Sequence, residues 1–543
     1  MPVINFNYQD LCRLIGEDVP KEILTERIPM LGADMQDTTD GDEMSVEFFP
    51  SRPDLFSVEG VARALRAFLG FEKGLKRYDV EESGLTLRVD PSVKSVRPEI
   101  AAAVVWDVDI DDAFIRSLME VQEKLHITIG RKRAKVAIGV HDLDKVKSPF
   151  LYAGVDPESH SFIPLGKTEG WNLREILDNH EKGRDYAHLM DGMEVYPLIT
   201  DADGEVLSFP PIINGTLTTV TDNTRNLLID MTGTDRKAVD GAMNILVTSL
   251  AERGGRIATV RLEGEEVRVT PDLDPVSLTL DIDNCNEFLG TRLTPEDMSD
   301  CMARMGYGSK VVGESLALEA PATRLDLLHP VDLMEDVAVA YGYERFGSTP
   351  VTVQTYGSEM PFTTTANGIR DIMTGLSYFE VTTLILSNPH DEFTRMGMQE
   401  GRVVSVSNPI TEDHTCMRAH LIPSMMRVLR RNKHRDLPQR IFEVGDVLKW
   451  TKTHRHVAAL CVHSKASFTE MKSIAESLLR EMSLDYELNA SDHPMFIPGR
   501  VASISVDGEE IGHFGEMSAA VIGTYEIGYP ITALELDLGP KLN

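Results

Sequence analysis

Three stretches of the chain carry hydrophobic and polar residues in a helical pattern. The first is 54–70, DLFSVEGVARALRAFLG, where Ser57 is a suitable N-cap. The second is 241–254, GAMNILVTSLAERG, which ends near a pair of glycines. The third is 294–308, where Thr294 and the acid three residues later have the spacing of a capping box. We therefore predict a helix in each stretch.

Other stretches are rich in β-branched and aromatic residues and predict strands. They are 101–110, 136–143, 209–220, 440–450 and 501–516. Asp507–Gly508 is the clearest hairpin turn among them. These patterns predict mixed α/β structure from about 85 to 265, and an α+β region with a largely antiparallel sheet over the last 190 or so residues.

Breaks in these patterns divide the chain. PDLDP at 271–275 is a plausible linker, and FGSTPVTV at 346–353 is the next boundary. The stretch between them, 277–346, has the pattern of a compact strand–helix–strand–helix unit. The predicted domains are 1–84, 85–268, 270–346 and 350–543.

The strongest local signal for chemistry lies in RLDLLHPVDLMEDVAVAYGYERF at 324–346. Pro330 favours a helix start, and i, i+3, i+4 spacing places Asp332, Glu335 and Asp336 on one face. Asp326 lies in the loop that enters this helix, so four carboxylates can converge. Oxygen ligands of this kind suit Mg²⁺. The alternative is a solvated first turn whose acids favour the helix dipole.

A second signal lies at 208–235, SFPPIINGTLTTVTDNTRNLLIDMTGTD. Two prolines precede Asn214 and can fix a rigid backbone at a pocket wall. The Asn214 amide offers both donors and acceptors. The threonines around it are β-formers first, so a surface strand is the alternative.

Charge and composition narrow the classes of protein to which the chain can belong. The chain has 54 Lys and Arg residues and 86 Asp and Glu residues, which gives a net charge of −32 and argues against a strongly basic nucleic-acid binder. Basic clusters at 131–135 and 427–435 could meet phosphates, or could be solvated or ion-paired surfaces. The five cysteines form no CxxC, and no run of 18 apolar residues occurs, so we expect a cytoplasmic protein without a membrane span.

Taken together, several segments resemble the phenylalanyl-tRNA synthetase beta subunit family in its archaeal and eukaryotic form. They follow one another in the family's order, which is more specific than any single motif. The segments are SRPDLFSVEGVARAL (51–65), KVAIGVHDLDKV (135–146), FPPIINGT with TDNTRNLLIDMTGTD (209–235), RLDLLHPVDLMEDVAVAYGYERF (324–346), SNPITEDHTCMRAHLIPSMM (407–426), RIFEVGDV (440–447) and HPMFIPGRVASI (493–504).

The resemblance implies a multidomain α+β fold. It comprises a mixed N-terminal domain (1–84), an editing-type B3/B4-like domain (85–268), a small magnesium-bearing B5-like domain (270–346) and a class II synthetase-like antiparallel core (350–543). It further implies an (αβ)₂ assembly with an alpha subunit that attaches phenylalanine to tRNA(Phe), using ATP and Mg²⁺, with the synthetic site in the alpha subunit.

The C-terminal core is expected to lack synthetic chemistry. Arg418 and Phe442–Glu443 match only fragments of the second class II motif. Gly512 and Gly515 occur in GHFGE, but no arginine follows them to hold ATP. We expect this core to pack against the alpha subunit.

The resemblance also assigns residues. Its metal positions fall on Asp326, Asp332, Glu335 and Asp336. Its editing pocket would hydrolyse tyrosyl-tRNA(Phe), because an apolar pocket rejects an added hydroxyl only weakly. Asn214 is the leading pocket candidate, followed by His141 and Thr216, although His141 could be a buried structural histidine.

Two other functions remain open at this stage. One is an independent Mg²⁺-dependent enzyme that handles phosphates on the acidic helix. The other is a scaffold subunit without editing, which would have no accessible polar pocket around Asn214.

Overall fold

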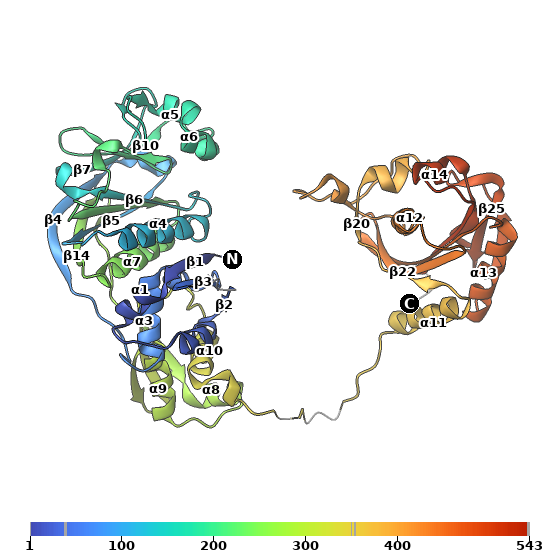
Figure 1. Cartoon of the computed structure of the whole chain (residues 1–543), viewed down its shortest axis with the longest axis horizontal. Coiled ribbons are helices and arrows are strands. Elements are labelled where there is room, and N and C mark those ends of the chain that lie inside the picture. The colour runs from blue at the N-terminus through green and yellow to red at the C-terminus, as the bar shows by residue number, and fades with distance from the viewer. Residues whose placement is uncertain (1, 37–40, 349, 352–354, 540–543) are drawn as a thin grey trace. The chain divides into compact units, whose positions relative to one another are not determined.

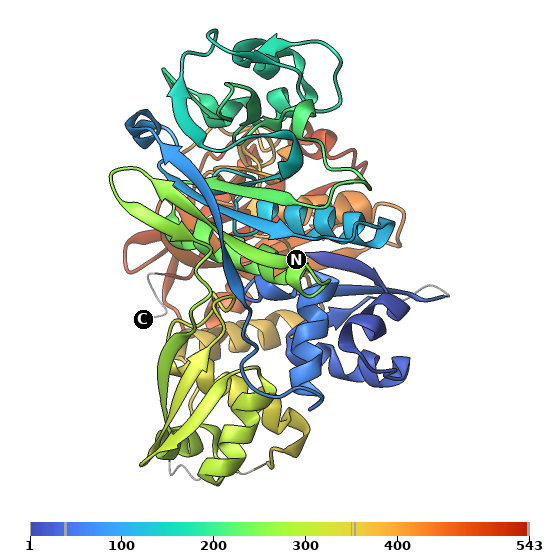
Figure 2. The same cartoon turned by 90° about the vertical axis from the view of Figure 1, so that its left-hand side faces the viewer.

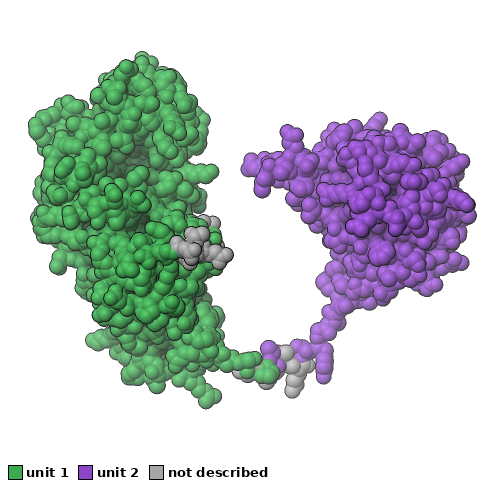
Figure 3. Space-filling model, in the orientation of Figure 1, with its two compact units in different colours: residues 1–350 green, residues 351–543 purple. Residues whose placement is uncertain are grey.

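The structure is a computed structural model that describes residues 2–36, 41–348, 350–351 and 355–539. The chain forms two compact units, Met1–Pro350 and Val351–Asn543 (Figure 3). The boundary predicted at 346–353 includes 349, 352 and 353, which lie outside the described residues, as do 1, 37–40, 354 and 540–543 of the predicted domains. No helix in the described ranges is long and apolar enough to cross a membrane.

Unit 1 begins with a small antiparallel sheet of order β1-β3-β2. Its elements are β1 (Val3–Asn7), α1 (Tyr8–Ile15), α2 (Lys21–Arg27), β2 (Ala33–Met35), β3 (Glu43–Phe48) and α3 (Val58–Phe68). Ser57 caps α3 by accepting a hydrogen bond from the Gly60 N–H, as the sequence predicts.

A ten-stranded sheet forms the centre of unit 1, in the order β12-β11-β10-β7-β4-β14-β5-β13-β6, with β15 paired to β14. The strands are β4 (Val80–Val89), β5 (Glu99–Trp106), β6 (Val136–Asp142), β7 (Phe150–Val155), β10 (Tyr196–Thr200), β11 (Val206–Phe209), β12 (Ile213–Asn214), β13 (Leu227–Gly233), β14 (Arg256–Glu263) and β15 (Val267–Thr270). Most pairs are antiparallel, while β4 runs parallel to β14 and to β7.

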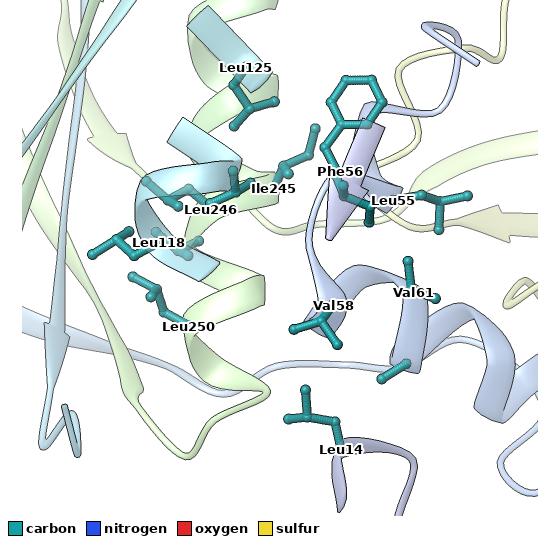
Figure 4. Close-up of a cluster of buried hydrophobic side chains, with 14 of the residues drawn as sticks. Leu14, Leu55, Phe56, Val58, Val61, Leu118, Leu125, Ile245, Leu246 and Leu250 are labelled. Carbon is teal, nitrogen blue, oxygen red and sulfur yellow. The ribbon is translucent and has the colours of Figure 1, made fainter. Parts of the chain in front are cut away.

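Two helices, α4 (Asp112–Ile127) and α7 (Arg236–Ala251), cover one face of this sheet. Leu118 and Leu125 of α4 meet Leu246 of α7 in a buried cluster that also takes in Phe56 from the N-terminal part (Figure 4). This shared core joins the N-terminal part of the unit to the sheet. The structure confirms a helix in the stretch predicted at 241–254, but this helix begins five residues earlier, at Arg236.

Two smaller modules lie at opposite ends of unit 1, with the large sheet between them (Figure 1 and Figure 2). One holds β8 (Ser161–Phe162), β9 (Trp171–Asn172), α5 (Leu173–Asn179) and α6 (Glu181–Tyr186). The other holds β16 (Val276–Asp281), α8 (Ile282–Leu289), α9 (Pro295–Arg304), β17 (Gly308–Val312), β18 (Ser315–Ala320) and α10 (Pro330–Tyr341).

The predicted strand–helix–strand–helix order of the second module is wrong. Two helices, α8 and α9, follow the first strand where one was predicted. Two strands, β17 and β18, then form a hairpin in place of the single second strand. The Thr294–Asp297 capping box of α9 is present as predicted.

Unit 2 is built on a seven-stranded sheet of order β19-β22-β23-β27-β26-β25-β24, antiparallel except for β19 against β22. The strands are β19 (Phe379–Glu380), β22 (Gln439–Lys449), β23 (Lys452–Val462), β24 (Tyr486–Ala490), β25 (Phe496–Val506), β26 (Glu509–Met517) and β27 (Ile531–Asp537). A small ribbon pairs β20 (Leu386–Ser387) with β21 (Cys416–Met417).

Helices cover both faces of the sheet in unit 2. Helices α11 (Pro361–Gly375) and α13 (Phe468–Glu481) cover one face, and α12 (Ile422–Arg431) and α14 (Ala519–Thr524) the other. The hairpin between β25 and β26 turns at Asp507 and Gly508, whose φ angles of 52° and 78° are those that an Asp-Gly turn favours. The α+β region with a largely antiparallel sheet, predicted for this part, is confirmed.

Candidate functional site

His141 lies in β6 and is completely buried. Its Nδ1 is 2.7 Å from the Thr218 hydroxyl, and its Nε2 is 2.7 Å from Oδ1 of Asp230. Asp230 is on the neighbouring strand β13, and Thr218 is in the turn after β12. An ionised Asp230 accepts from Nε2–H, so that Nδ1 accepts from the threonine hydroxyl. Three segments of the unit are thereby fixed to one imidazole ring.

Gly139 makes room for this contact. It lies opposite Asp230 in the β6–β13 pair. A Cβ on Gly139 would lie 2.2 Å from Oδ1 of Asp230 and 2.8 Å from Nε2 of His141. The carboxyl group therefore packs directly over the glycine, and any side chain there would displace it.

Asn214 and Ser208 approach from the other edge of the sheet. They are directly opposed in the β11–β12 pair, so both side chains point to the same face. Asn214 Nδ2 donates to the Val140 carbonyl at 3.4 Å, although β12 and β6 are the two ends of the strand order. The sheet therefore curls until its two edges meet. Ser208 Oγ is buried and has no hydrogen-bond partner among the described residues.

The strand register places these groups on one face. Leu228 lies opposite His141, and Ile199 lies opposite Ser208. Leu228 and Ile199 belong to the same buried apolar cluster. Because opposed residues of antiparallel strands share a face, His141 and Ser208 both point toward that cluster. This face of the sheet thus holds apolar side chains, an amide, a hydroxyl and a carboxyl–imidazole pair.

Of the predicted pocket residues, Asn214 and His141 lie together and Thr216 lies apart. Thr216 is exposed, and its hydroxyl donates to the Pro164 carbonyl at 3.0 Å. Sequence reasoning missed Asp230, and it took Thr218 for a strand-former. The signal for Asp230 is a single acid at an alternate position of an otherwise apolar strand, LLIDM.

The four predicted metal ligands are distributed along α10 and the loop before it. Asp332 Oδ2 accepts from the N–H groups of Leu328 and His329 and so caps the helix. Glu335 is exposed and makes no hydrogen bond or ion pair within the described ranges. Asp336 is buried, although the sequence placed it on one face with Glu335, because consecutive helical residues are rotated by about 100°.

Arg324 links the remaining two carboxylates. It lies 2.8 Å from Oδ2 of both Asp326 and Asp336. Burial lowers the pKa of Arg324, but the two acids raise it well above the ordinary value. The ligand atoms of the four residues do not come within 4.8 Å of one another as a group of three or more. The metal assignment stays a prediction.

Cys461, His463 and Glu470 of unit 2 do bring their ligand atoms within 4.8 Å of one another. However, the Lys465 N–H donates to Nδ1 of His463, which leaves the proton on Nε2, facing Glu470. Arg440 also pairs with Glu470 at 3.2 Å. His463 and Glu470 therefore have their partners within an ion-paired cluster that includes Arg440.

In the C-terminal core, Arg418 is buried and committed to the protein. Its Nη1 donates to Oε1 of Glu443 at 2.8 Å, and its Nε donates to the Asp446 carbonyl at 2.8 Å. The glycines of GHFGE serve packing, because a Cβ on Gly512 would lie 2.0 Å from the Glu535 carbonyl. Neither feature leaves a group free for ATP.

Family models match three parts of the chain. They are the B3/4 domain at residues 109–255, the tRNA synthetase B5 domain at 278–343, and the phenylalanyl tRNA synthetase beta chain CLM domain at 347–538.

Curated relatives match over almost the whole chain. The phenylalanine–tRNA ligase beta subunit of Methanothrix thermoacetophila is 43% identical over 540 residues, 99% of this chain and 100% of that protein. The protein of the same name from Methanocaldococcus jannaschii is 40% identical over 550 residues, again 99% and 100%. A crystal structure of an N-terminal fragment of the phenylalanyl-tRNA synthetase beta subunit from Pyrococcus horikoshii has a TM-score of 0.61 and 38% identity, and covers 63% of this chain and 100% of the fragment.

Proposed function

Because the chain belongs to the family of phenylalanine–tRNA ligase beta subunits, we propose that it works with an alpha subunit in attaching phenylalanine to tRNA(Phe) with ATP, and that its own chemistry is hydrolysis of tyrosyl-tRNA(Phe). The observation that carries the second part is the His141–Asp230 pair on a face of the large sheet that also holds Asn214 and the unpartnered Ser208. The finer assembly proposed is an (αβ)₂ heterotetramer.

The synthetic site belongs to the alpha subunit. Arg418, the one arginine of the C-terminal core that matches a class II motif fragment, is neutralised by Glu443 and is 2% exposed. A guanidinium held in this way cannot also bind phosphate bidentately. The class II synthetase-like core is therefore a partner surface for the alpha subunit.

Selection against tyrosine rests on buried polar groups. A tyrosyl side chain carries a hydroxyl that can bond to Ser208 Oγ or to the Asn214 amide. A phenylalanyl side chain would leave the buried Ser208 Oγ without a partner, which costs about 1–3 kcal/mol. The apolar side chains of Leu228 and Ile199 would not distinguish one ring from the other. The pocket therefore favours the wrong amino acid, as a hydrolytic second site requires.

Hydrolysis uses a water held by Asp230. His141 fixes Oδ1 of the carboxylate, while no described residue donates to Oδ2. Oδ2 orients the water and takes its proton as the water oxygen attacks the ester carbonyl. The bond from that carbonyl carbon to the ribose oxygen then breaks, and the ribose oxygen takes the proton that Asp230 removed from the water. Tyrosine and free tRNA(Phe) leave.

Magnesium fits the acidic helix in part. All four residues offer oxygen donors, and a protein Mg²⁺ site needs only one or two carboxylates with waters. Asp332 and Glu335 keep oxygen atoms free of side-chain partners, whereas Asp326 and Asp336 share Arg324. When bound, the ion supplies positive charge that orders the loop before α10. These residues hold the ion and do not transfer phosphoryl groups.

The subunit role predicts the outcome of a reconstitution. The full chain alone should not charge tRNA(Phe) with phenylalanine, and the mixture with its alpha partner should, because only the partner holds a synthetic site. Aminoacylation assays with radiolabelled phenylalanine check this. Charging by the chain alone would contradict the assignment of the C-terminal core.

The editing role predicts a selective loss. In the reconstituted complex, Asp230→Ala should slow deacylation of preformed tyrosyl-tRNA(Phe) by about 100-fold or more, because general acid–base groups contribute that much. Phenylalanine charging should stay unchanged. Asp222→Ala, at an exposed acid of the same unit, is the control. Equal deacylation by the parent and the Asp230→Ala complex would refute the role of Asp230.

The metal site predicts a binding defect. Isothermal titration of the full chain with Mg²⁺ should show at least about tenfold weaker binding in Asp332→Ala and in Glu335→Ala, since each removes one of few carboxylate ligands. Glu314→Ala, at an exposed acid of the same module, should bind like the parent. Parental affinity in both test variants would rule out these ligands.

A further inference from the structure

The loop between α4 and β6 carries three consecutive basic residues in an unusual backbone conformation. Arg131, Lys132 and Arg133 have φ angles of 47°, 54° and 67°. This left-handed region is unfavourable for residues that carry a side chain, and such residues persist only where their surroundings fix them.

Buried groups hold this loop in place. Arg97, which is 4% exposed, donates from its guanidinium to the carbonyls of Arg133 and Ala134 at 3.0 and 3.3 Å. The Arg133 N–H donates to the His126 carbonyl at 3.3 Å. The strained conformation is thus maintained by contacts beneath the loop, and the side chains of Arg131 and Lys132 stay exposed.

Arg133 ties the loop to the candidate site. Its Nη1 donates to the carbonyls of Pro211 and Ile212 at 3.2 and 2.9 Å. Its guanidinium also lies 4.5 Å from the ring centroid of Tyr186. Two residues after Ile212 comes Asn214, so the loop and the pocket wall form one connected structure.

The charges of Arg131 and Lys132 are not neutralised. Neither residue makes an ion pair or a side-chain hydrogen bond within the described ranges. By contrast, Arg430 and Lys433 of the other basic cluster both pair with Glu526, at 2.5 and 3.0 Å. In a chain with a net charge of −32, adjacent unpaired cations in a rigid loop are placed for an anionic ligand.

We propose that the loop 131–133 is a phosphate-binding loop that receives the single-stranded 3′ end of the RNA substrate as its aminoacyl group enters the pocket at Asn214 and His141. The proposal rests on the proposed editing function, because that function brings a nucleic-acid end to this pocket. Arg131 and Lys132 neutralise backbone phosphates, which positions the strand without reading its sequence. Arg133 acts as a positioning residue.

The test uses the reconstituted complex of the full chain and its alpha partner with tyrosyl-tRNA(Phe). The double variant Arg131→Ala/Lys132→Ala should raise the KM for deacylation about tenfold and leave kcat unchanged, because it removes ground-state binding only. The plot of log(kcat/KM) against log salt should become shallower by about 1 to 2. The matched control is Arg292→Ala/Lys310→Ala, two exposed cations of the same unit that make no ion pair within the described ranges.

Parental KM and salt slope in the double variant would overturn the proposal while leaving editing intact. A variant that loses alpha-subunit binding, with unchanged salt slope, would assign the loop to a protein contact and also overturn it. If the parent complex does not deacylate, the editing function fails. The loop is then tested by equilibrium binding of an acceptor-stem minihelix with amide-linked tyrosine, where the double variant should again bind about tenfold more weakly.

Discussion

The burial of one carboxyl group, that of Asp230, governs the arrangement of the candidate site. At 3% exposure, the group is almost entirely removed from bulk solvent and needs a hydrogen-bond partner within the protein. His141 meets this need from the adjacent strand, Thr218 holds the far side of the imidazole ring, and Gly139 leaves the space that the contact requires. The curl of the large sheet then brings Asn214, at its opposite edge, to Val140 beside this pair. Hydrogen bonding to one buried acid thus brings the polar groups of the candidate site together.

The sequence predicted local features well because short-range chemistry decides them. The Thr294–Asp297 capping box, the Asp507–Gly508 turn and the start of α10 at Pro330 all depend on residues within a few positions of one another. Contacts between residues that are far apart in the sequence could not be predicted in this way. His141 and Asp230 are 89 residues apart, and their meeting depends on the β6–β13 register. Asn214 and Val140 meet only because a ten-stranded sheet curls, and periodicity along the chain carries no trace of that.

The acidic helix shows the limit of spacing arguments in another way. Helical periodicity placed three acids on one face of α10, but Asp336 is buried while Glu335 is exposed, and spacing could not show that Arg324 reaches both Asp326 and Asp336. The same holds in unit 2, where Glu443 neutralises the charge of Arg418 in an ion pair. In both places a guanidinium pairs with carboxylates, and only the folded structure shows which charged groups stay available to a ligand. Arg131 and Lys132 are available in this sense, and Arg133 of the same loop is bonded to the segment that leads to Asn214.

The central claim is that this face of the large sheet selects tyrosine and exposes its ester to Asp230. Its most direct test is equilibrium binding of two non-hydrolysable analogues, adenosine with amide-linked tyrosine and with amide-linked phenylalanine, to the full chain by calorimetry. The account predicts that the tyrosyl analogue binds at least about tenfold more tightly, since the unpaired buried hydroxyl of Ser208 penalises the phenylalanyl one, and that the Ser208→Ala/Asn214→Ala double variant loses this preference. Equal affinity of the two analogues for the parent chain would contradict the account.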